Sequence, residues 1–212
     1  MVRLTEDVFA SAVETRSPQG IAALIEPPIH RLEDILQQPN PLILVAEGLQ
    51  DPGNLGTLAR SAEAFGAAGL LTTPGTVSIW NQKALRASVG SAFRLPVVPV
   101  TRHEIEEFQK HGIRLLASIG AESPGVTTAQ DTDLATACAI MIGNEGSGLT
   151  RDWIGLADSL ITIPCPGPVE SLNAAIAGSL LLYEASRQRT ASSRSVERIP
   201  GPLRRRPTGA AR

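Results

Sequence analysis

Short apolar runs alternate with helical segments between Pro41 and about Arg189, and this alternation constrains the fold more than any other feature of the chain. The runs are rich in Leu, Ile, Val and Ala, as is typical of strands buried on both faces of a sheet. Strands separated by helices imply βαβ units and therefore parallel strands. The sequence predicts an α/β fold, a mainly parallel sheet flanked by helices. The predicted strands are Leu42–Ala46, Gly69–Leu71, Val97–Val100, Arg114–Ser118, Ala139–Ile142 and Leu160–Ile163.

The segments between and after these runs have helical patterns, and residues 1–40 do not follow the alternation. Forty residues bury little core by themselves. They are therefore either an N-terminal extension that packs on the main domain or the remnant of a larger domain. They contain a predicted short helix, Glu6–Val13, an extended piece, Ile21–Ile25, and a connector that includes Arg31–Leu36. The helices predicted in the main domain are Asn54–Phe65, Asn81–Val89, His103–Lys110, a short turn around Thr150–Ile154 and a long closing helix, Ser171–Arg187.

The charge of the chain is distributed unevenly. Residues 187–212 contain eight Arg and one Glu, whereas the rest of the chain has 11 Lys and Arg against 20 Asp and Glu. The end of the chain also lacks apolar periodicity, which predicts a disordered tail. A basic tail on an acidic body suits either a polyanionic partner such as nucleic acid or a solubilising role. The predicted division is an extension at 1–40, a main domain at 41–189 and a basic tail at 190–212.

Several functional classes are disfavoured by the sequence. No apolar run approaches the roughly 20 residues that span a bilayer, and the first residues lack the pattern of a signal peptide. A soluble, cytoplasmic protein without a membrane partner is expected. Two cysteines, Cys138 and Cys165, are too few for a disulfide framework or a zinc site, and no metal is expected. Cys138 is predicted to lie in the core, and no His follows Cys165 to activate it as a nucleophile.

Three segments rich in small and polar residues each follow a predicted strand. They are Asp51–Arg60, Gly143–Gly148 and Ile163–Asn173. In an open parallel sheet, ligands bind at the loops that follow the carboxyl ends of the strands. The three loops are therefore expected to form one composite site.

The first loop contains the candidate with the clearest chemistry. Asn54 opens a predicted helix, where Asn is a preferred N-cap. Arg60 lies further along the same, largely apolar helix, so an anionic partner is expected for it. A guanidinium suits phosphate because its planar fork can bind two oxygen atoms at once.

The other two loops give weaker signals taken singly. Gly143–Gly148 lacks the Gly-Lys-Ser/Thr end of a phosphate-binding Walker loop. What remains is a tight turn from which Glu145 projects. In the third loop Ser171 is predicted to cap the last helix. Asn173 would then stand in its first turn, a position that capping explains poorly because helix interiors disfavour Asn.

Taken together and in order, the three loops resemble a known set of motifs. They read Asn54-x-Gly56-x-x-x-Arg60, Gly143-x-Glu145-x-x-Gly148 and Ser171-Leu172-Asn173. The set resembles the three motifs of the SpoU (TrmH-type) RNA 2′-O-ribose methyltransferases of the SPOUT superfamily, and the resemblance covers about residues 40–188. It implies a C-terminal trefoil knot, a homodimer and S-adenosylmethionine as cofactor. It also implies cofactor contacts by Gly143, Ile163 and Leu172, with Arg60 as the catalytic residue supported by Asn54, Glu145, Ser171 and Asn173.

The resemblance implies transfer of a methyl group from S-adenosylmethionine to a ribose 2′-hydroxyl of tRNA or rRNA. A ribose hydroxyl is a weak nucleophile, so it must be positioned and its proton removed. Arg60 either acts as a base with local help or fixes the geometry of phosphate and hydroxyl, because Arg is normally protonated. The alternatives are a non-catalytic RNA-binding protein on the same scaffold and a methyltransferase that acts on a base. Glu14–Ile21 resembles the end of the N-terminal RNA-recognition domain that many relatives carry.

Overall fold

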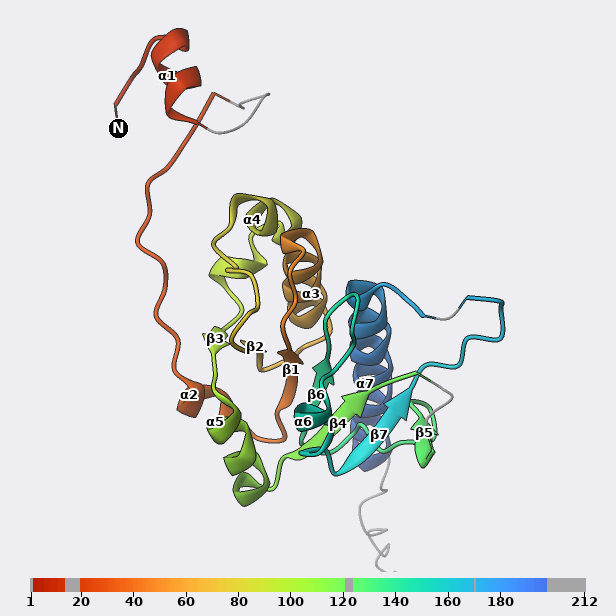
Figure 1. Ribbon diagram of the computed structural model, residues 1–212. Helices are drawn as coiled ribbons and strands as arrows, with labels where there is room; N and C mark the ends of the chain where they lie inside the picture. Colours follow the sequence, from red (N-terminus) through yellow and green to blue (C-terminus); the bar gives the residue numbers. More distant parts are fainter. Residues whose placement is uncertain (1, 14–19, 121–123, 170, 198–212) are drawn as a thin grey trace, which may run out of the picture.

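The apolar runs form one parallel seven-stranded sheet with the strand order β3-β2-β1-β6-β4-β7-β5 (Figure 1). The computed structural model describes residues 2–13, 20–120, 124–169 and 171–197. Each predicted strand is confirmed to within one residue at either end. Val126–Thr128 was not predicted, because the segment is short and contains one apolar residue. The strands are β1 Leu42–Ala46, β2 Gly69–Thr72, β3 Val97–Pro99, β4 Arg114–Ser118, β5 Val126–Thr128, β6 Cys138–Ile142 and β7 Ser159–Thr162.

Helices cover both faces of the sheet, as predicted. The longer ones, α3 and α7, pack on the same face, and α5 and α6 lie on the other. The pleat of β1 explains this division, since successive side chains point to opposite faces of a strand. The helices are α1 Glu6–Ala12, α2 Leu32–Leu36, α3 Pro52–Ala64, α4 Gln82–Ser88, α5 Arg102–Glu106, α6 Arg151–Ile154 and α7 Ala174–Glu197, with 3₁₀ turns η1 Ser91–Phe93 and η2 Glu107–His111.

Two hydrophobic layers result from this arrangement. Leu42, Leu44 and Ala46 of β1 face α3, α4 and α7, whereas Ile43 and Val45 face α2, α5, η2 and α6. All five side chains are almost completely buried. The middle of the sheet is thus inaccessible from either face, and ligands can approach it only at the edge where the strands end.

Of the described residues before β1, those at the end of the N-terminal region pack on the body. Helix α1 has no buried residue and stands apart from the sheet in Figure 1. The predicted extended piece at Ile21–Ile25 is exposed and forms no strand. By contrast, the predicted connector contains α2, whose Ile35 is fully buried against the sheet. Residues 14–19, and with them most of the segment that resembles an RNA-recognition domain, lie outside the described residues.

Helix α7 differs from its prediction at both ends. It begins at Ala174 rather than Ser171, and it continues to Glu197 rather than ending at Arg187. The helix therefore includes the first residues of the predicted tail. The remainder of the tail prediction, 198–212, lies outside the described residues.

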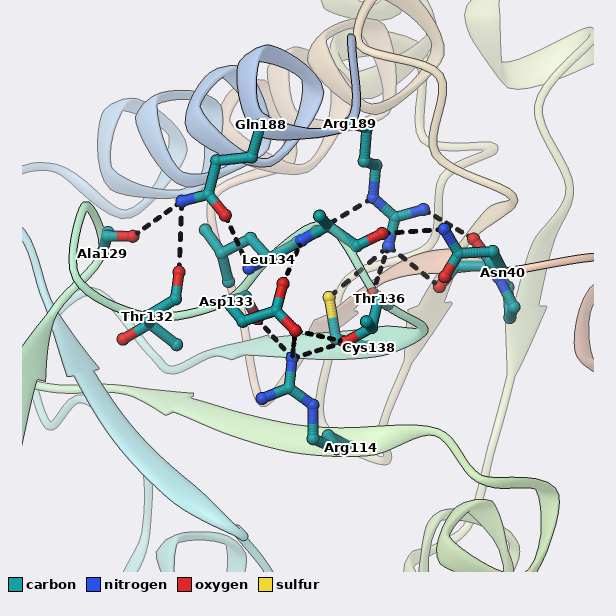
Figure 2. A network of polar contacts seen from close by, with 12 residues as sticks. Asn40, Arg114, Ala129, Thr132, Asp133, Leu134, Thr136, Cys138, Gln188 and Arg189 are labelled. Atoms are coloured by element: carbon teal, nitrogen blue, oxygen red, sulfur yellow. Dashed lines mark hydrogen bonds and ion pairs between the residues drawn. The ribbon is translucent and has the colours of Figure 1, made fainter. Parts of the chain in front are cut away.

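The C-terminal part of α7 is tied to the amino-terminal edge of the sheet (Figure 2). The guanidinium of Arg189 donates to the carbonyl oxygens of Asn40 (2.6 Å), Leu134 (3.0 Å) and Thr136 (2.6 Å). It also approaches the thiol of Cys138, which is buried in the core as predicted. Burial raises the pKa of that thiol, so Cys138 stays protonated at neutral pH. The side chain of Arg189 thus joins α7 to the segment before β1 and to the segment before β6.

Arg189→Ala is expected to lower the free energy of unfolding by about 2 kcal/mol, because it leaves carbonyl oxygens without their donor. Denaturant unfolding followed by circular dichroism measures the change. Arg187→Ala, two residues earlier, removes an exposed guanidinium from Glu184, which keeps a hydrogen bond from Gln188, and should change stability less. Equal stability of Arg189→Ala and Arg187→Ala would show that the contacts of Arg189 do not hold the helix.

Candidate active site

Two of the three predicted loops meet directly at the carboxyl edge of the sheet. Strands β1 and β6 are neighbours, so the loops that follow them lie side by side. The carboxylate of Glu145, from the loop after β6, accepts hydrogen bonds from the backbone N–H groups of Gln50 (3.3 Å) and Asp51 (3.2 Å). These residues belong to the loop after β1. The composite site expected from the sequence is therefore confirmed for the first two loops.

The third loop reaches the same place through Asn173. The side-chain Nδ2 of Asn173 donates to Oδ1 of Asn54 (3.1 Å), and Nδ2 of Asn54 donates to Oε1 of Glu145 (2.8 Å). One residue from each predicted loop thus takes part in a single chain of hydrogen bonds. Asn54 and Glu145 lie 91 positions apart in the sequence, and Asn54 and Asn173 lie 119 positions apart.

The direction of this chain is fixed at both of its ends. Oδ1 of Asn173 accepts from the backbone N–H groups of Ala175 (2.9 Å) and Ile176 (3.2 Å), so its Nδ2 must face Asn54. At the other end, an ionised Glu145 can only accept. Each amide NH₂ uses one hydrogen in the chain and has a second one. Asn54 and Asn173 therefore offer a donor each to a bound ligand.

The sequence suggests an N-cap role for Asn54 and none for Asn173, and the structure shows the reverse. The prediction that Asn54 is an N-cap is wrong, because the cap of α3 is Asp51, whose Oδ1 accepts from the N–H groups of Gly53 (2.5 Å) and Asn54 (3.2 Å). An Asp followed by Pro at the first helical position is a common helix start, and that signal was available in Asp51-Pro52. With the cap supplied by Asp51, the side chain of Asn54 is free to turn toward Glu145.

The cap of α7 is Asn173 and not Ser171. The Oδ1 contacts of Asn173 with Ala175 and Ile176 are those of an N-cap, and the backbone N–H of Ala177 closes the first turn on its carbonyl. Ser171 is exposed and forms no hydrogen bond with any residue that the structure describes. The structure thus brings Asn54, Glu145 and Asn173 together, and leaves Ser171 at the margin of the site.

The loop after β6 is held closed by a residue that the sequence analysis did not single out. Asn144 donates from Nδ2 to the carbonyl oxygen of Gly48 (2.8 Å), and its Oδ1 accepts from the N–H of Gly146 (2.8 Å). Its backbone pairs in both directions with Gly148. An Asn within a glycine-rich turn is a signal for such a side-chain turn. Asn144 positions the loop from which Glu145 projects.

The three predicted cofactor residues differ in their surroundings. Gly143 is buried at the end of β6, and a side chain there would meet the backbone of Gly148 and Leu149 at 2.1 Å. Ile163 follows β7 and is half-buried, as is Leu172, which directly precedes Asn173. Ile163 and Leu172 offer half-buried apolar surface of the kind that contacts an adenine ring, and Gly143 lets the loop after β6 close on its own backbone. The residues therefore fit a nucleoside-containing cofactor.

Arg60 does not contact the Asn54–Glu145–Asn173 chain. It lies on α3 six positions after Asn54, which places it about 9 Å further along the helix axis and on another face. Its side chain is exposed and lines a surface hollow with Glu63, Val89, Ser91 and Arg94. Among the residues that the structure describes, Arg60 has no hydrogen-bond or ion-pair partner. The anionic partner that the sequence predicts for Arg60 is therefore not supplied by the described residues of the chain.

The charge of Glu145 is fixed by its contacts. Partial burial raises the pKa of its carboxyl, but the amide of Asn54 and the backbone N–H groups of Glu145, Gln50 and Asp51 together lower it more. The net pKa lies below the ordinary value of 4.5. An ionised carboxylate with several donors is a poor base at neutral pH. Glu145 is thus suited to orient Asn54 and the loop after β1.

Glu145→Gln is expected to destabilise the protein in a pH-dependent way. Because folding lowers the pKa, ionised Glu145 adds stability that is complete above its ordinary value of 4.5 and is lost as the pH falls through the folded value. The difference in unfolding free energy between wild type and variant should be largest near neutral pH and shrink below pH 4.5. Urea unfolding at a series of pH values measures it. A difference that does not depend on pH would contradict the ionised network.

Comparison with known proteins decides the family. Residues 41–183 match the model of the SpoU rRNA Methylase family. The chain belongs to the SpoU family. This confirms the resemblance that the three motifs carry, and the match spans all of them.

Curated relatives agree with this membership. The chain is 33% identical over 181 residues to RlmP of Bacillus subtilis, a 23S rRNA guanosine 2′-O-methyltransferase, and the match covers 85% of this chain and 70% of RlmP. It is also 33% identical over 181 residues to a 23S rRNA uridine 2′-O-methyltransferase of Streptomyces viridochromogenes, covering 83% of this chain and 63% of that enzyme. The chain thus spans about two thirds of the length of these relatives.

A solved structure with bound cofactor shares the fold. The SpoU methyltransferase AviRb of Streptomyces viridochromogenes, in complex with AdoMet, matches with a TM-score of 0.69 and 33% identity. The match covers 77% of this chain and 63% of AviRb. The parallel sheet with helices on both faces is therefore the fold of a SpoU methyltransferase.

In the described part of the present chain, no helix is long and apolar enough to cross a membrane.

Proposed function

We propose that the chain transfers a methyl group from S-adenosylmethionine to the 2′-hydroxyl of a ribose in rRNA or tRNA. The observation that carries this proposal is the convergence of Asn54, Glu145 and Asn173, one from each family motif, at the carboxyl edge of the sheet. The predicted enzyme class and cofactor are confirmed by relatives named as rRNA 2′-O-methyltransferases and by the AdoMet complex of AviRb. The two rRNA relatives are named for different nucleotides, a guanosine and a uridine.

Gly143, Ile163 and Leu172 hold the cofactor in this proposal. S-adenosylmethionine supplies an electrophilic methyl group on a sulfonium. Gly143 lets the loop after β6 close on itself, because a side chain there would meet the backbone of Gly148 and Leu149, and the closed loop presents its backbone to the ligand. Ile163 and Leu172 contribute half-buried apolar surface. The prolines that follow Ile163, at 164, 166 and 168, stiffen this loop and reduce the entropy that is lost when a ligand orders it.

Arg60 is the catalytic residue in this proposal, and it acts on the RNA. Its exposed guanidinium binds a phosphate next to the target ribose and fixes the 2′-hydroxyl for in-line attack. Asn54 and Asn173 each offer one N–H to the ribose or its phosphate. Glu145 orients Asn54, and Ser171 supports the ribose from the margin of the site. The proton of the hydroxyl is released to water as the hydroxyl is methylated, and Arg60 itself stays protonated.

The finer structural expectations of the family are part of the proposal. They are a trefoil knot in the C-terminal segment, a homodimer, a cytoplasmic location, and the division into an extension, a main domain and a basic tail. For the dimer, support comes from α7, where Ile176 (53% exposed), Leu180 (43%) and Tyr183 (53%) form an apolar stripe on one face. Such a stripe on a helix that otherwise packs on the sheet suits a second copy of the chain.

Methyl transfer from radiolabelled S-adenosylmethionine to deproteinised rRNA and tRNA tests the activity. Label that enters RNA only in the presence of the protein is the expected result. The main alternative is a non-catalytic RNA-binding protein, which would bind RNA but not the cofactor. Calorimetry with S-adenosylmethionine separates the two, and a folded protein that does not bind it would contradict the enzyme.

A further inference from the structure

An ion pair between Glu63 and Arg94 lines the same surface hollow as Arg60. Arg94, directly after η1, binds the carboxylate of Glu63 through two hydrogen bonds, from Nε (2.5 Å) and from Nη2 (2.8 Å). Glu63 belongs to α3, three positions after Arg60. The contact with Arg94, together with a hydrogen bond from Ser91, lowers the pKa of Glu63 to about 2. Glu63 therefore carries a full negative charge at neutral pH.

The geometry places that charge within reach of Arg60. Side chains three positions apart on a helix are neighbours, and opposite charges at this spacing attract one another. Arg60, Glu63 and Arg94 also line the same surface hollow. Glu63 nevertheless pairs with Arg94, and Arg60 has no partner among the residues that the structure describes. The carboxylate thus takes the more distant arginine, with which it forms two parallel bonds.

We propose that Arg94 is a positioning residue, which holds Glu63 so that the guanidinium of Arg60 stays free for the RNA phosphate. The inference rests on the proposed function of Arg60. Without Arg94, the carboxylate of Glu63 turns to Arg60 and competes with phosphate for the same N–H groups. Glu63 and Arg94 neutralise one another, so that Arg60 supplies the net positive charge of the hollow.

The backbone around Arg94 is built for this contact. Gly90 has a φ of +86°, and a Cβ atom there would lie 2.9 Å from Nη1 of Arg94. The positive φ favours glycine at this position, and the guanidinium of Arg94 lies beside it. Ser91, 2% exposed, approaches Glu63 from the same turn. One short segment, Gly90–Arg94, therefore supplies both groups that hold the carboxylate.

A double-mutant cycle tests the inference. Arg94→Ala is expected to lower the turnover of methyl transfer roughly tenfold, whereas Arg94→Ala combined with Glu63→Gln should return to within about twofold of wild type. Glu63→Gln alone should be as active as wild type. Arg102→Ala, which breaks an exposed ion pair with Glu106 on another face, is the matched control and should change nothing. A loss in Arg94→Ala that Glu63→Gln does not reverse would overturn the inference, and would mean that Arg94 contacts RNA itself or only holds η1 in place.

A chemical probe gives a second answer that does not depend on activity. Phenylglyoxal modifies arginine side chains, and an arginine held in an ion pair reacts more slowly than a free one. Peptide mass spectrometry should find that Arg60 is modified several-fold more slowly in Arg94→Ala than in wild type, and at the original rate in the double variant. An unchanged rate in Arg94→Ala would contradict the inference. If wild type transfers no methyl group, the proposed function fails, and this labelling still decides the role of Arg94.

Discussion

Arg60→Ala is expected to lower methyl transfer to RNA by roughly a thousandfold and to leave the affinity for S-adenosylmethionine nearly unchanged. The expectation follows from position, because Arg60 does not contact the Asn54–Glu145–Asn173 chain and lines a separate surface hollow with Glu63 and Arg94. Its guanidinium has no partner among the described residues, so its removal leaves no buried group unpaired. The variant should therefore fold as wild type does.

The two effects are measured separately. Single-turnover transfer with saturating protein reports on the chemical step, and calorimetry reports on the cofactor. Arg86→Ala removes another exposed arginine, from neighbouring α4, and should keep activity within about twofold of wild type. Unchanged turnover in Arg60→Ala would remove Arg60 from the mechanism, and a matched loss of cofactor affinity would move it into the cofactor site.

Gly143→Ala is expected to have the largest effect on the cofactor site. The added Cβ would lie 2.1 Å from the carbonyl carbon of Gly148 and from the nitrogen of Leu149, and neither backbone atom can turn away as a side chain would. The loop must open, which breaks the pairing of Asn144 with Gly148. Overpacking of this kind costs about 3 kcal/mol, which lowers the melting temperature of a chain of this size by about 6–12 °C.

Cofactor affinity should fall together with stability. Because Glu145 stands in the same loop, opening the loop also withdraws the acceptor that orients Asn54. Gly146→Ala is the matched control in the same turn, since the nearest atom to its Cβ would be Oδ1 of Asn144 at an ordinary 3.5 Å. Thermal unfolding with and without S-adenosylmethionine compares them. Equal melting temperatures of Gly143→Ala and Gly146→Ala would show that the close approach of Gly143 to the backbone of Gly148 does not stabilise the loop.

The sheet could be predicted closely because its signal is local. Leu42–Ala46 and Arg114–Ser118 were predicted to the residue, since an apolar run bounded by polar turns is typical of a buried strand. β5 was missed because Val126–Thr128 takes part in the sheet through backbone pairing with β7 and carries little apolar surface of its own. The strand order was not predicted, because it depends on contacts between distant segments.

The site shows the same division between local and distant signals. Asn54, Glu145 and Asn173 were predicted to share one site and do lie in contact, but the contacts themselves were not predicted, because capping is decided by competition among neighbouring polar groups. The N-cap of α3 is Asp51 rather than Asn54, and the N-cap of α7 is Asn173 rather than Ser171. These two exchanges bring the asparagines into contact. The Glu63–Arg94 pair joins positions 31 residues apart, and nothing in the local sequence of either one indicates the other.

Alkaline hydrolysis of the methylated RNA tests the central claim most directly. A methyl group on the 2′-oxygen prevents that oxygen from attacking the adjacent phosphate, so alkali leaves the labelled nucleotide joined to its neighbour. After incubation of rRNA and tRNA with the protein and methyl-labelled S-adenosylmethionine, we expect the label in alkali-resistant dinucleotides. Label in mononucleotides would mean that a base is methylated, and would contradict the assignment of the ribose.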